Sequence, residues 1–396
     1  MSTSAVVVGA GIAGLASAVS LARVGWQITV LERAAEAGEI GAGFAMSRNA
    51  VAAFRGLGFG DDDVAALGYA TWAGGTFDWR GRPILTVPGS PEVRDAVGLI
   101  GVHRRRVHAA LLGRAVALGV HVVPRSTVTD LDPGVADGAP AVVGGRAADL
   151  VVGADGIRSA VRGVVFPRIA PVYSGYSSWR AVVPGVFGGE ALTQFWGPHA
   201  EYGILPTTPA GGPDETYWYG YVRMPERTRL GGPDGELAAA KARAAGWAAP
   251  VQEVLDATDP ATLLRHDVHH LPGGAPSYTS GRVVLVGDAA HGTVPTMGQG
   301  AATALEDGLC VGLLVGAPVA AGGRLAPALA GFDAARRPRC RGLARASVAS
   351  GRFGAHLGVG QGLRNALMRL TPTGAVVRGA EAAMGWTPPQ AAPPVR

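Results

Sequence analysis

Three glycines near the start of the chain have the spacing of a loop that binds a dinucleotide. Gly9, Gly11 and Gly14 form a GxGxxG motif within residues 6–15, between an apolar run typical of a strand and a helical pattern. In such a loop the first glycine makes the tight turn, the second lets a pyrophosphate approach the backbone, and the third lets the helix pack on the strand. Glu32 ends the next predicted strand, where a carboxylate can bind ribose hydroxyls. The motif does not say which dinucleotide binds.

A second block, residues 281–308, carries an aspartate directly after another apolar strand pattern. Asp288 falls at the carboxyl end of this strand, the place where open α/β sheets hold ligand groups. The Gly298-Gln299-Gly300 turn then opens a predicted helix. The positive end of that helix can offset negative charge on a bound group. The alternative is an ordinary strand-turn-helix with a solvated aspartate.

A third block, residues 151–162, follows a further predicted strand. It contains Asp155, Gly156, Ser159 and Arg162, and it could be a strand end with a surface arginine cluster. Arg104 begins a run of three arginines, of which the second and third fit a solvated helix face better than a ligand site.

Taken in order, these blocks resemble the group A flavoprotein monooxygenases, the para-hydroxybenzoate hydroxylase-like family, and most closely its small salicylate and urate hydroxylase-type members. In that family the aspartate of the second block contacts the ribityl chain of FAD, and a proline and glycines lie beside the isoalloxazine ring. The third block serves the pyrophosphate region and the passing nicotinamide. This chain departs from the pattern at Ala302-Thr303, near where many relatives carry asparagine.

The motifs and the resemblance together imply a set of FAD-contacting residues and a smaller substrate-side set. The expected FAD contacts are Gly9, Gly11, Ala13, Gly14, Glu32, Arg33, Gly43, Arg104, Val128, Asp155, Gly287, Asp288, Gly298, Gln299, Gly300 and Ala301. The substrate-side candidates are Pro295, Arg180 and Tyr217.

The resemblance implies an NAD(P)H- and dioxygen-dependent monooxygenase that hydroxylates a small aromatic or heteroaromatic substrate, with secondary metabolism as one setting. NADH or NADPH would reduce the flavin, dioxygen would add to form a flavin hydroperoxide, and its distal oxygen would pass to the substrate. Because the chain has one GxGxxG motif, the reductant is expected to visit only transiently.

Several activities use the same framework. Epoxidation or another tailoring oxygenation would need no change of motif, and the motifs would also fit a flavin-dependent reductase, a halogenase or a non-catalytic flavin-binding protein. A halogenase needs a lysine near the channel, whereas Lys241, the only lysine, fits a surface helix.

Residues 172–270 alternate aromatic and polar positions as antiparallel strands do. The alternation sets Trp179 and Arg180 on opposite faces, so Arg180 either anchors an anionic substrate or covers a sheet edge. Tyr217 and the tyrosines at 219 and 221 share one face, for packing or for lining a pocket. The histidines between 266 and 270 alternate along an extended segment, and no metal site is expected there.

These patterns predict an α/β protein: an FAD-binding, Rossmann-like (GR2-type) domain with an inserted, mostly antiparallel β-sheet substrate domain and C-terminal helices. The expected FAD-binding domain is discontinuous, residues 1–70, 98–171 and 271–345. The substrate domain comprises residues 71–97 and 172–270, and a C-terminal helical segment covers residues 346–396. One Ala-rich helix, residues 236–247, is expected within the substrate domain, and a strand at residues 128–131 within the first.

Composition restricts the partners and the compartment. The 396 residues are 48% hydrophobic, and the net charge of +5 comes from scattered arginines without a nucleic-acid-binding motif. Cys310 and Cys340 match no redox or metal spacing, which fits a reducing cytoplasm. No signal peptide is predicted, because no basic leader precedes the apolar strand pattern that begins at Ala5. No membrane span is predicted, because the uncharged stretch at residues 308–323 is shorter than the roughly 20 residues a span needs. A monomer or homodimer that binds a small aromatic substrate and dioxygen is expected.

Overall fold

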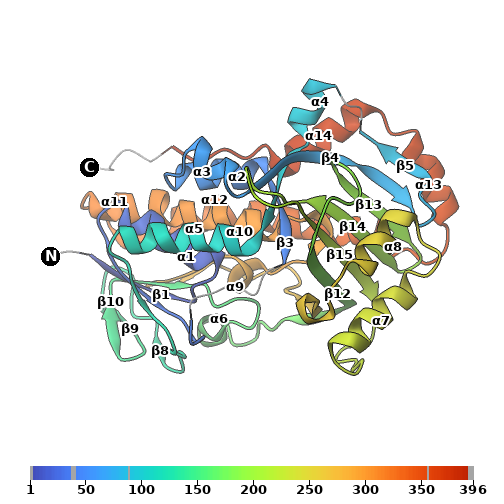
Figure 1. Ribbon diagram of the computed structural model, residues 1–396. Helices are drawn as coiled ribbons and strands as arrows, with labels where there is room; N and C mark the ends of the chain where they lie inside the picture. The colour runs from blue at the N-terminus through green and yellow to red at the C-terminus, as the bar shows by residue number, and fades with distance from the viewer. Residues whose placement is uncertain (1–2, 37–41, 88–89, 355, 391–396) are drawn as a thin grey trace.

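The computed structural model describes residues 3–36, 42–87, 90–354 and 356–390 (Figure 1). Within these ranges the chain forms a six-stranded sheet, a small three-stranded sheet and a nine-stranded sheet, with helices packed on them. The predicted α/β class is confirmed.

Parallel strands form most of the six-stranded sheet among the described residues. Its order is β17 (Thr279–Ser280), β18 (Val283–Leu285), β11 (Leu150–Gly153), β1 (Ser4–Val8), β2 (Gln27–Leu31) and β7 (His121–Val123), with β17 alone antiparallel to its neighbour. The central strands are runs of buried valines and leucines, as strands covered on both faces require. Consequently three blocks begin at the carboxyl ends of parallel strands, on the same side of one sheet: the GxGxxG loop after β1, the Asp155 block after β11 and the Asp288 block after β18.

Helices cover one face of this sheet, and the small sheet covers part of the other (Figure 1). The helices are α1 (Ile12–Ala22), α5 (Arg104–Ala117), α10 (Gly300–Cys310) and α12 (Leu325–Phe353); the small sheet is β8 (Leu131–Asp132), β9 (Ala141–Val143) and β10 (Arg146–Ala148). A Cβ added to Gly308 of α10 would lie 2.4 Å from the Cβ of Ala16 in α1. Only glycine therefore lets these two helices approach so closely.

One helix in the described ranges is long and apolar enough to cross a membrane by length and composition. It is the 21-residue run Gly300–Ala320, formed by α10, the π-helical η3 (Val311–Gly316) and α11 (Ala317–Ala320). The protein itself buries 72% of its most apolar window, and α10 packs against α1 and α2 (Arg48–Gly56). This burial is typical of a core helix.

The nine-stranded sheet lies beside the first sheet and carries the predicted aromatic strands. Its order within the described ranges is β16 (Leu264–His270), β12 (Val172–Pro184), β15 (Glu215–Arg223), β14 (Ala200–Pro206), β13 (Leu192–Gly197), β4 (Gly68–Asp78), β6 (Gly98–His103) and β3 (Gly43–Ser47), and β5 (Pro83–Thr86) pairs with β4. The predicted alternation is confirmed, since Trp179 and Trp218 are buried on the face covered by α7 (Pro233–Arg243) and α8 (Ala249–Asp256), whereas Tyr217 and Tyr219 belong to clusters on the other face.

Two local predictions were wrong. The Ala-rich helix predicted at residues 236–247 is α7, which ends earlier, at Arg243. A second helix, α8, follows it, and Trp247 lies between the two helices and packs on the sheet. The predicted strand at residues 128–131 has only Leu131 in β8, because the chain before it passes the end of β2, where the Ser126 N–H bonds the Glu32 carbonyl at 2.8 Å. Tertiary contacts outweigh strand propensity in this loop.

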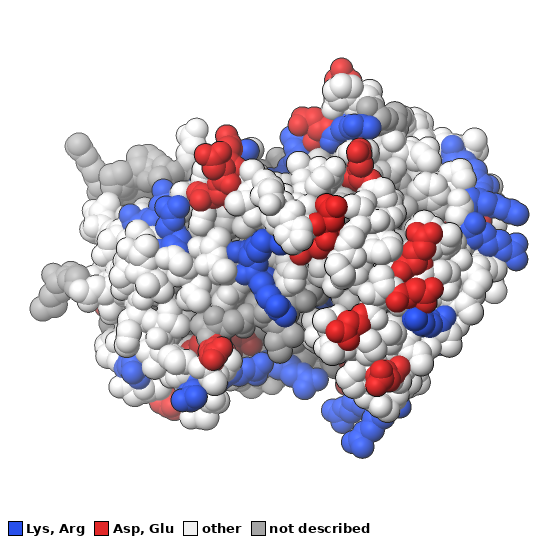
Figure 2. Space-filling model, in the orientation of Figure 1, with Lys and Arg blue, Asp and Glu red and all other residues white. Residues whose placement is uncertain are grey.

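The remaining helices enclose the sheets. They are α3 (Asp61–Ala65), α4 (Pro91–Ala96), α6 (Ala160–Val165), η1 (Pro260–Thr262), α9 (Asp288–His291), η2 (Pro295–Met297), α13 (Gln361–Arg369) and α14 (Thr373–Met384). The helix α12 runs through residue 345 without a break. On the face shown in Figure 2 the two signs of charge are interspersed, with Lys and Arg side chains gathered at the edge over α13 and β5.

Candidate active site

The GxGxxG loop is held rigidly around one peptide group. The Ala10 N–H donates to Glu32 Oε2 at 2.8 Å, and the Ala10 carbonyl lies 2.8 Å from His108 Nε2 on α5. Gly9 has φ +102°, and a Cβ there would lie 2.6 Å from the Ala154 carbonyl oxygen. By contrast, a Cβ on Gly11 would have nothing within 4 Å. The loop thus leaves open backbone where a phosphate would approach.

Contacts between the three blocks bring them together at one edge of the sheet. A Cβ added to Gly287 would lie 2.9 Å from Ala13 Cβ, so the Asp288 block packs directly on the start of α1. Arg162 Nη1 donates to the Ala289 carbonyl at 3.0 Å, which ties the Asp155 block to the Asp288 block. Arg162 is only 2% exposed, so the alternative of a surface arginine cluster is wrong for this residue.

Asp288 is exposed although the residues around it are buried. It follows β18 directly, as predicted, and begins α9. A carboxylate that faces outward at the end of a buried strand is available to a ligand hydroxyl. Asp155 differs, because its carboxylate accepts from Ser159 Oγ at 2.5 Å and from the Ala160 N–H at 2.6 Å. Asp155 therefore caps α6 and positions the loop.

The Gly298-Gln299-Gly300 turn opens α10 as predicted. Gly298 is left-handed, with φ +63°, and a Cβ on Gly300 would have nothing within 4 Å. The Gln299 side chain points inward: its Oε1 accepts from Asn49 Nδ2 at 3.0 Å. Only the backbone of Gln299 is thus left for a cofactor. Asn49 also donates to Glu306 at 2.6 Å, a link that no local spacing in the sequence could reveal.

Behind this turn lies a buried ionic cluster, formed by Glu306, Asp307, His291 and Arg336, whose side chains are 0–4% exposed. Asp307 accepts from His291 Nε2 at 2.5 Å and from Arg336 Nε at 2.7 Å, and Glu306 lies 2.7 Å from Arg336 Nη1. Burial would raise the pKa of Asp307, but His291 and Arg336 outweigh it and lower the pKa to about 2. The cluster is a set of compensated charges.

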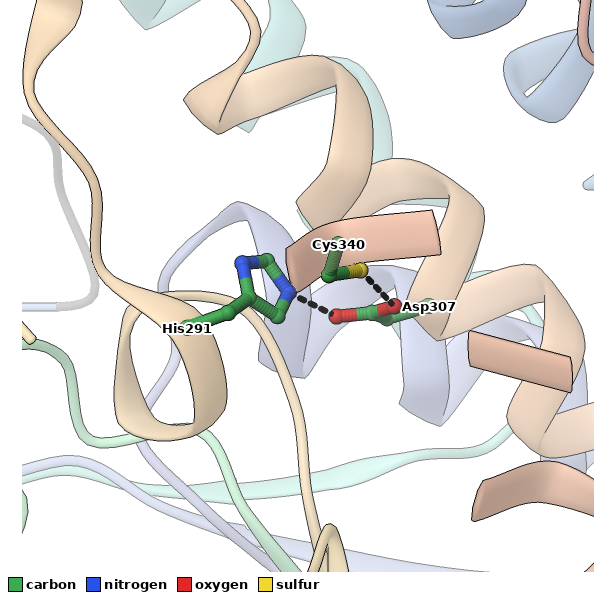
Figure 3. A group of neighbouring side chains, drawn as sticks. All are labelled: His291, Asp307 and Cys340. Atoms are coloured by element: carbon green, nitrogen blue, oxygen red, sulfur yellow. Dashed lines mark hydrogen bonds and ion pairs between the residues drawn. The ribbon is translucent and has the colours of Figure 1, made fainter. Parts of the chain in front are cut away.

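Cys340 joins this cluster, as Figure 3 shows, with its Sγ 3.8 Å from Asp307 Oδ1. The ligand atoms of His291, Asp307 and Cys340 all lie within 4.8 Å of one another, a grouping that could hold a metal ion and that sequence spacing did not reveal. However, the Asp307 oxygens already accept from Arg336, His291 and the Gly287 N–H. The contacts are those of an ion-pair network that fixes the Gly287 turn beside Asp288.

The substrate-side candidates lie on the face of the nine-stranded sheet that carries Tyr217. Strand β12 lies between β15 and β16, so the alternative that Arg180 covers a sheet edge is wrong. A Cβ added to Gly43 of β3 would lie 2.3 Å from the Tyr217 ring, which places this face against β3. Burial raises the pKa of Tyr217 to about 12, and the positive charges of Arg180 and Arg104 oppose the rise. Arg180 and Tyr217 are therefore neighbours in a largely buried region.

Val294, the residue before Pro295, belongs to one buried cluster with Tyr221, and Tyr219 of the same face packs against this cluster. The segment that follows Asp288 and the substrate face therefore meet, and exposed Pro295 follows this contact. His266 lies on this face beside Ser178, and burial, together with Arg180 and Arg104, lowers its pKa to about 4. His269 turns away and bonds Glu226 at 3.0 Å.

The other predicted residues take varied positions. Arg33 is exposed after β2, Val128 is buried in the loop before β8, and Ala301 is half-buried in the first turn of α10. Arg104 begins α5, and its N–H donates to the Ala42 carbonyl at 2.9 Å. The geometry at Gly11, Asp288 and Gly300 fits FAD: open backbone at two helix N-termini for its phosphates and ring, and an outward carboxylate between them.

Comparison with known proteins agrees with this geometry. Residues 2–347 match the family of FAD binding domain proteins, and the chain belongs to that family. Its class is the FAD-dependent monooxygenases, as the resemblance predicted.

Two curated relatives and one solved structure illustrate the match. The chain is 34% identical to the aurachin C monooxygenase/isomerase of Stigmatella aurantiaca, over 88% of each chain. It is 36% identical to the 3-amino-4-hydroxybenzoate 2-monooxygenase of Streptomyces cremeus, over 84% of this chain and 83% of that one. The Klebsiella pneumoniae HpxO structure with FAD and uric acid superposes with a TM-score of 0.82 at 26% identity, over 96% of each chain.

Proposed function

We propose that this monooxygenase hydroxylates a small aromatic or heteroaromatic ring that carries an anionic or oxo substituent, with NADH or NADPH as transient reductant and dioxygen as the oxygen donor. The observation that carries the proposal is the placement of Arg180 and Tyr217 on the sheet face that meets β3 and the segment after Asp288. A relative named for an aminohydroxybenzoate supports a ring of this size class.

We assign the FAD contacts to the predicted residues at the edge of the six-stranded sheet, with Asp288 on the ribityl chain. Bound FAD supplies electron transfer from the nicotinamide and the activation of dioxygen. The protein contributes the positive ends of α1 and α10, which stabilise negative charge, and a sheet that excludes water from the ring. We place the enzyme in the cytoplasm as a monomer or homodimer, in keeping with two free, buried cysteines.

The anchor is supplied by Arg180. Its Nε is buried and has no hydrogen-bond partner among the described residues, although buried guanidinium nitrogens are normally paired. An anionic or carbonyl oxygen of a substrate would satisfy it. A sheet arginine kept only for packing would leave this donor unsatisfied, so a ligand explains the geometry better.

The function is tested on the FAD-loaded protein with a panel of hydroxybenzoates and hydroxyquinolines. We expect one or more of them to accelerate NAD(P)H oxidation and to yield a product with one oxygen atom from ¹⁸O-labelled dioxygen. Bound FAD that neither nicotinamide reduces would refute the monooxygenase assignment and favour a flavin-binding protein.

Removal of the anchor should affect substrate binding selectively. We expect Arg180→Ala to raise the KM for an anionic aromatic substrate about 10- to 100-fold, since a lost charged hydrogen bond costs about 1.5–3 kcal/mol. The flavin-to-protein ratio should be unchanged. Steady-state kinetics and the flavin absorbance check both, with Arg223→Ala at the exposed end of β15 as the control. Unaltered kinetics in Arg180→Ala would argue against the anchor.

A further inference from the structure

A buried carboxyl group on the substrate face has no ionic partner. Glu201 of β14 is 3% exposed, and burial raises its pKa to about 7. Among the described residues its side chain forms no ion pair, in contrast to Glu306 and Asp307, whose charges are compensated by arginines. A buried carboxylate without a partner is costly, so such a group is expected to have a role.

Two neighbours hold Glu201 in a directed chain of hydrogen bonds. Gln194 Nε2 donates to the Tyr219 hydroxyl at 2.7 Å, and that hydroxyl in turn hydrogen-bonds Glu201 and lowers its pKa against the effect of burial. The Tyr219 ring can reach across β14 because residue 203 is glycine: a Cβ there would lie 2.1 Å from the ring. The chain of bonds therefore ends on Glu201.

This chain lies beside the proposed anchor. Arg180 is the register partner of Tyr219 in the next strand, and Tyr219 packs against the buried cluster that contains Val294, the residue just before Pro295. A carboxylate has about four acceptor positions, and Tyr219 fills one of them. The face thus carries a cationic donor on β12 and, two strands across and one row of residue pairs along, an acceptor on β14 with capacity to spare.

Resting on the proposed function, we propose that Glu201, ordered by Tyr219 and Gln194, accepts a hydrogen bond from the substrate and so selects aromatic rings that bear a hydroxyl, amino or ring N–H donor. Arg180 binds the oxygen-bearing side of such a ring, and Glu201 binds its donor. A ring without a donor leaves a buried carboxyl unsatisfied, which reduces its affinity.

Ring-matched probes test the selection by binding alone. The probes are 3- and 4-hydroxybenzoate and their methyl ethers, titrated calorimetrically into the FAD-loaded protein without nicotinamide. We expect at least one hydroxybenzoate to bind about 10- to 100-fold more tightly than its ether, and Glu201→Leu, which offers no acceptor, to remove most of the difference. Glu253→Gln, an exposed residue of α8 on the opposite face, should leave it unchanged.

The pH dependence separates this role from a structural one. The phenols titrate near pH 10, as tyrosine does, and the carboxyls near 4, so between about pH 6 and 8.5 the probes keep their charge. Hydroxybenzoate affinity should rise with pH through about 7 in the wild type, as Glu201 ionises, and be flat in Glu201→Gln. The tyrosines and the histidine beside Glu201 do not change charge in this range: burial raises the pKa of Tyr219 and Tyr221, and burial lowers that of His356, which bonds Tyr221, to about 4.

A further variant keeps the test decisive if the Glu201 variants fold poorly. Tyr219→Phe removes the hydroxyl that favours the ionised carboxylate, so the midpoint of the pH dependence should move upward. The proposal would be overturned if both hydroxybenzoates bound only as tightly as their methyl ethers, or if none of the four probes bound. It would also be overturned if the pH midpoint of binding were the same in Tyr219→Phe as in the wild type. Selective binding without stimulated NAD(P)H oxidation would instead refute the proposed hydroxylation and leave the role of Glu201 standing.

Discussion

Replacement of Arg336 by methionine is expected to lower the free energy of unfolding by about 3–5 kcal/mol, because it breaks two buried ion pairs at once. Among the described residues, Glu306 would keep only Arg339, and Asp307 only His291, as a cationic partner. Glu306 and Asp307 are both 0% exposed, and Arg336 lies 2.7 Å from each. Methionine preserves the volume of the side chain, so the effect reports charge and not a cavity. Urea denaturation of the apoprotein, followed by far-UV circular dichroism, measures the change.

The matched control is Arg337→Met, one residue further along α12. Arg337 is 31% exposed and pairs with Asp333 one turn away, an interaction worth at most about 1 kcal/mol. If both variants lost the same stability, the buried cluster would have no special contribution. A loss of FAD affinity in Arg336→Met is also expected, since Asp307 fixes the Gly287 N–H at 2.9 Å beside Asp288.

Replacement of Asp288 by alanine is expected to lower the flavin-to-protein ratio and to weaken FAD binding about 10- to 100-fold, the cost of one charge-assisted hydrogen bond. Because Asp288 is exposed, the fold and its unfolding transition should be nearly unaffected. Absorbance of the purified protein and titration of the apoprotein with FAD, followed by flavin fluorescence, measure the change.

Asp62→Ala, an exposed aspartate of α3, is the control and should keep its full flavin content. An Asp288→Ala protein that purified with unchanged flavin would show that the ribityl contact lies elsewhere. Asp288→Asn, which can still accept a hydrogen bond, should retain most of the affinity.

Sequence patterns predicted the parts of the site that depend on local geometry. The strand-turn-helix around Gly9, the aspartate that follows β18 and the Gly298-Gln299-Gly300 turn that opens α10 each follow from residue types at fixed spacing. The alternation of Trp179 and Arg180 also predicted their faces, since side chains of a strand alternate whatever the strand pairs with.

Other features depend on contacts between distant residues, and the sequence carries no local sign of them. His108 bonds Ala10 across 98 positions, and Arg336 pairs with Asp307 across 29. The sequence alone left open whether Arg180 covers a sheet edge. The strand order excludes that interpretation, because β12 lies between β16 and β15. No spacing in the sequence marks Glu201, which is a single glutamate in an aromatic strand.

The strand order has a consequence for synthesis of the protein in the cell. β1 pairs with β11, and β11 pairs in turn with β18, whose first residue is Val283. A nascent chain that has left the ribosome only as far as β16 therefore has the GxGxxG loop but neither Asp288 nor α10, the helix that covers α1. Until about 40 further residues emerge, α1 exposes apolar surface that invites aggregation, and FAD has only part of its site. Flavin capture is thus a late event that can complete the fold but cannot begin it.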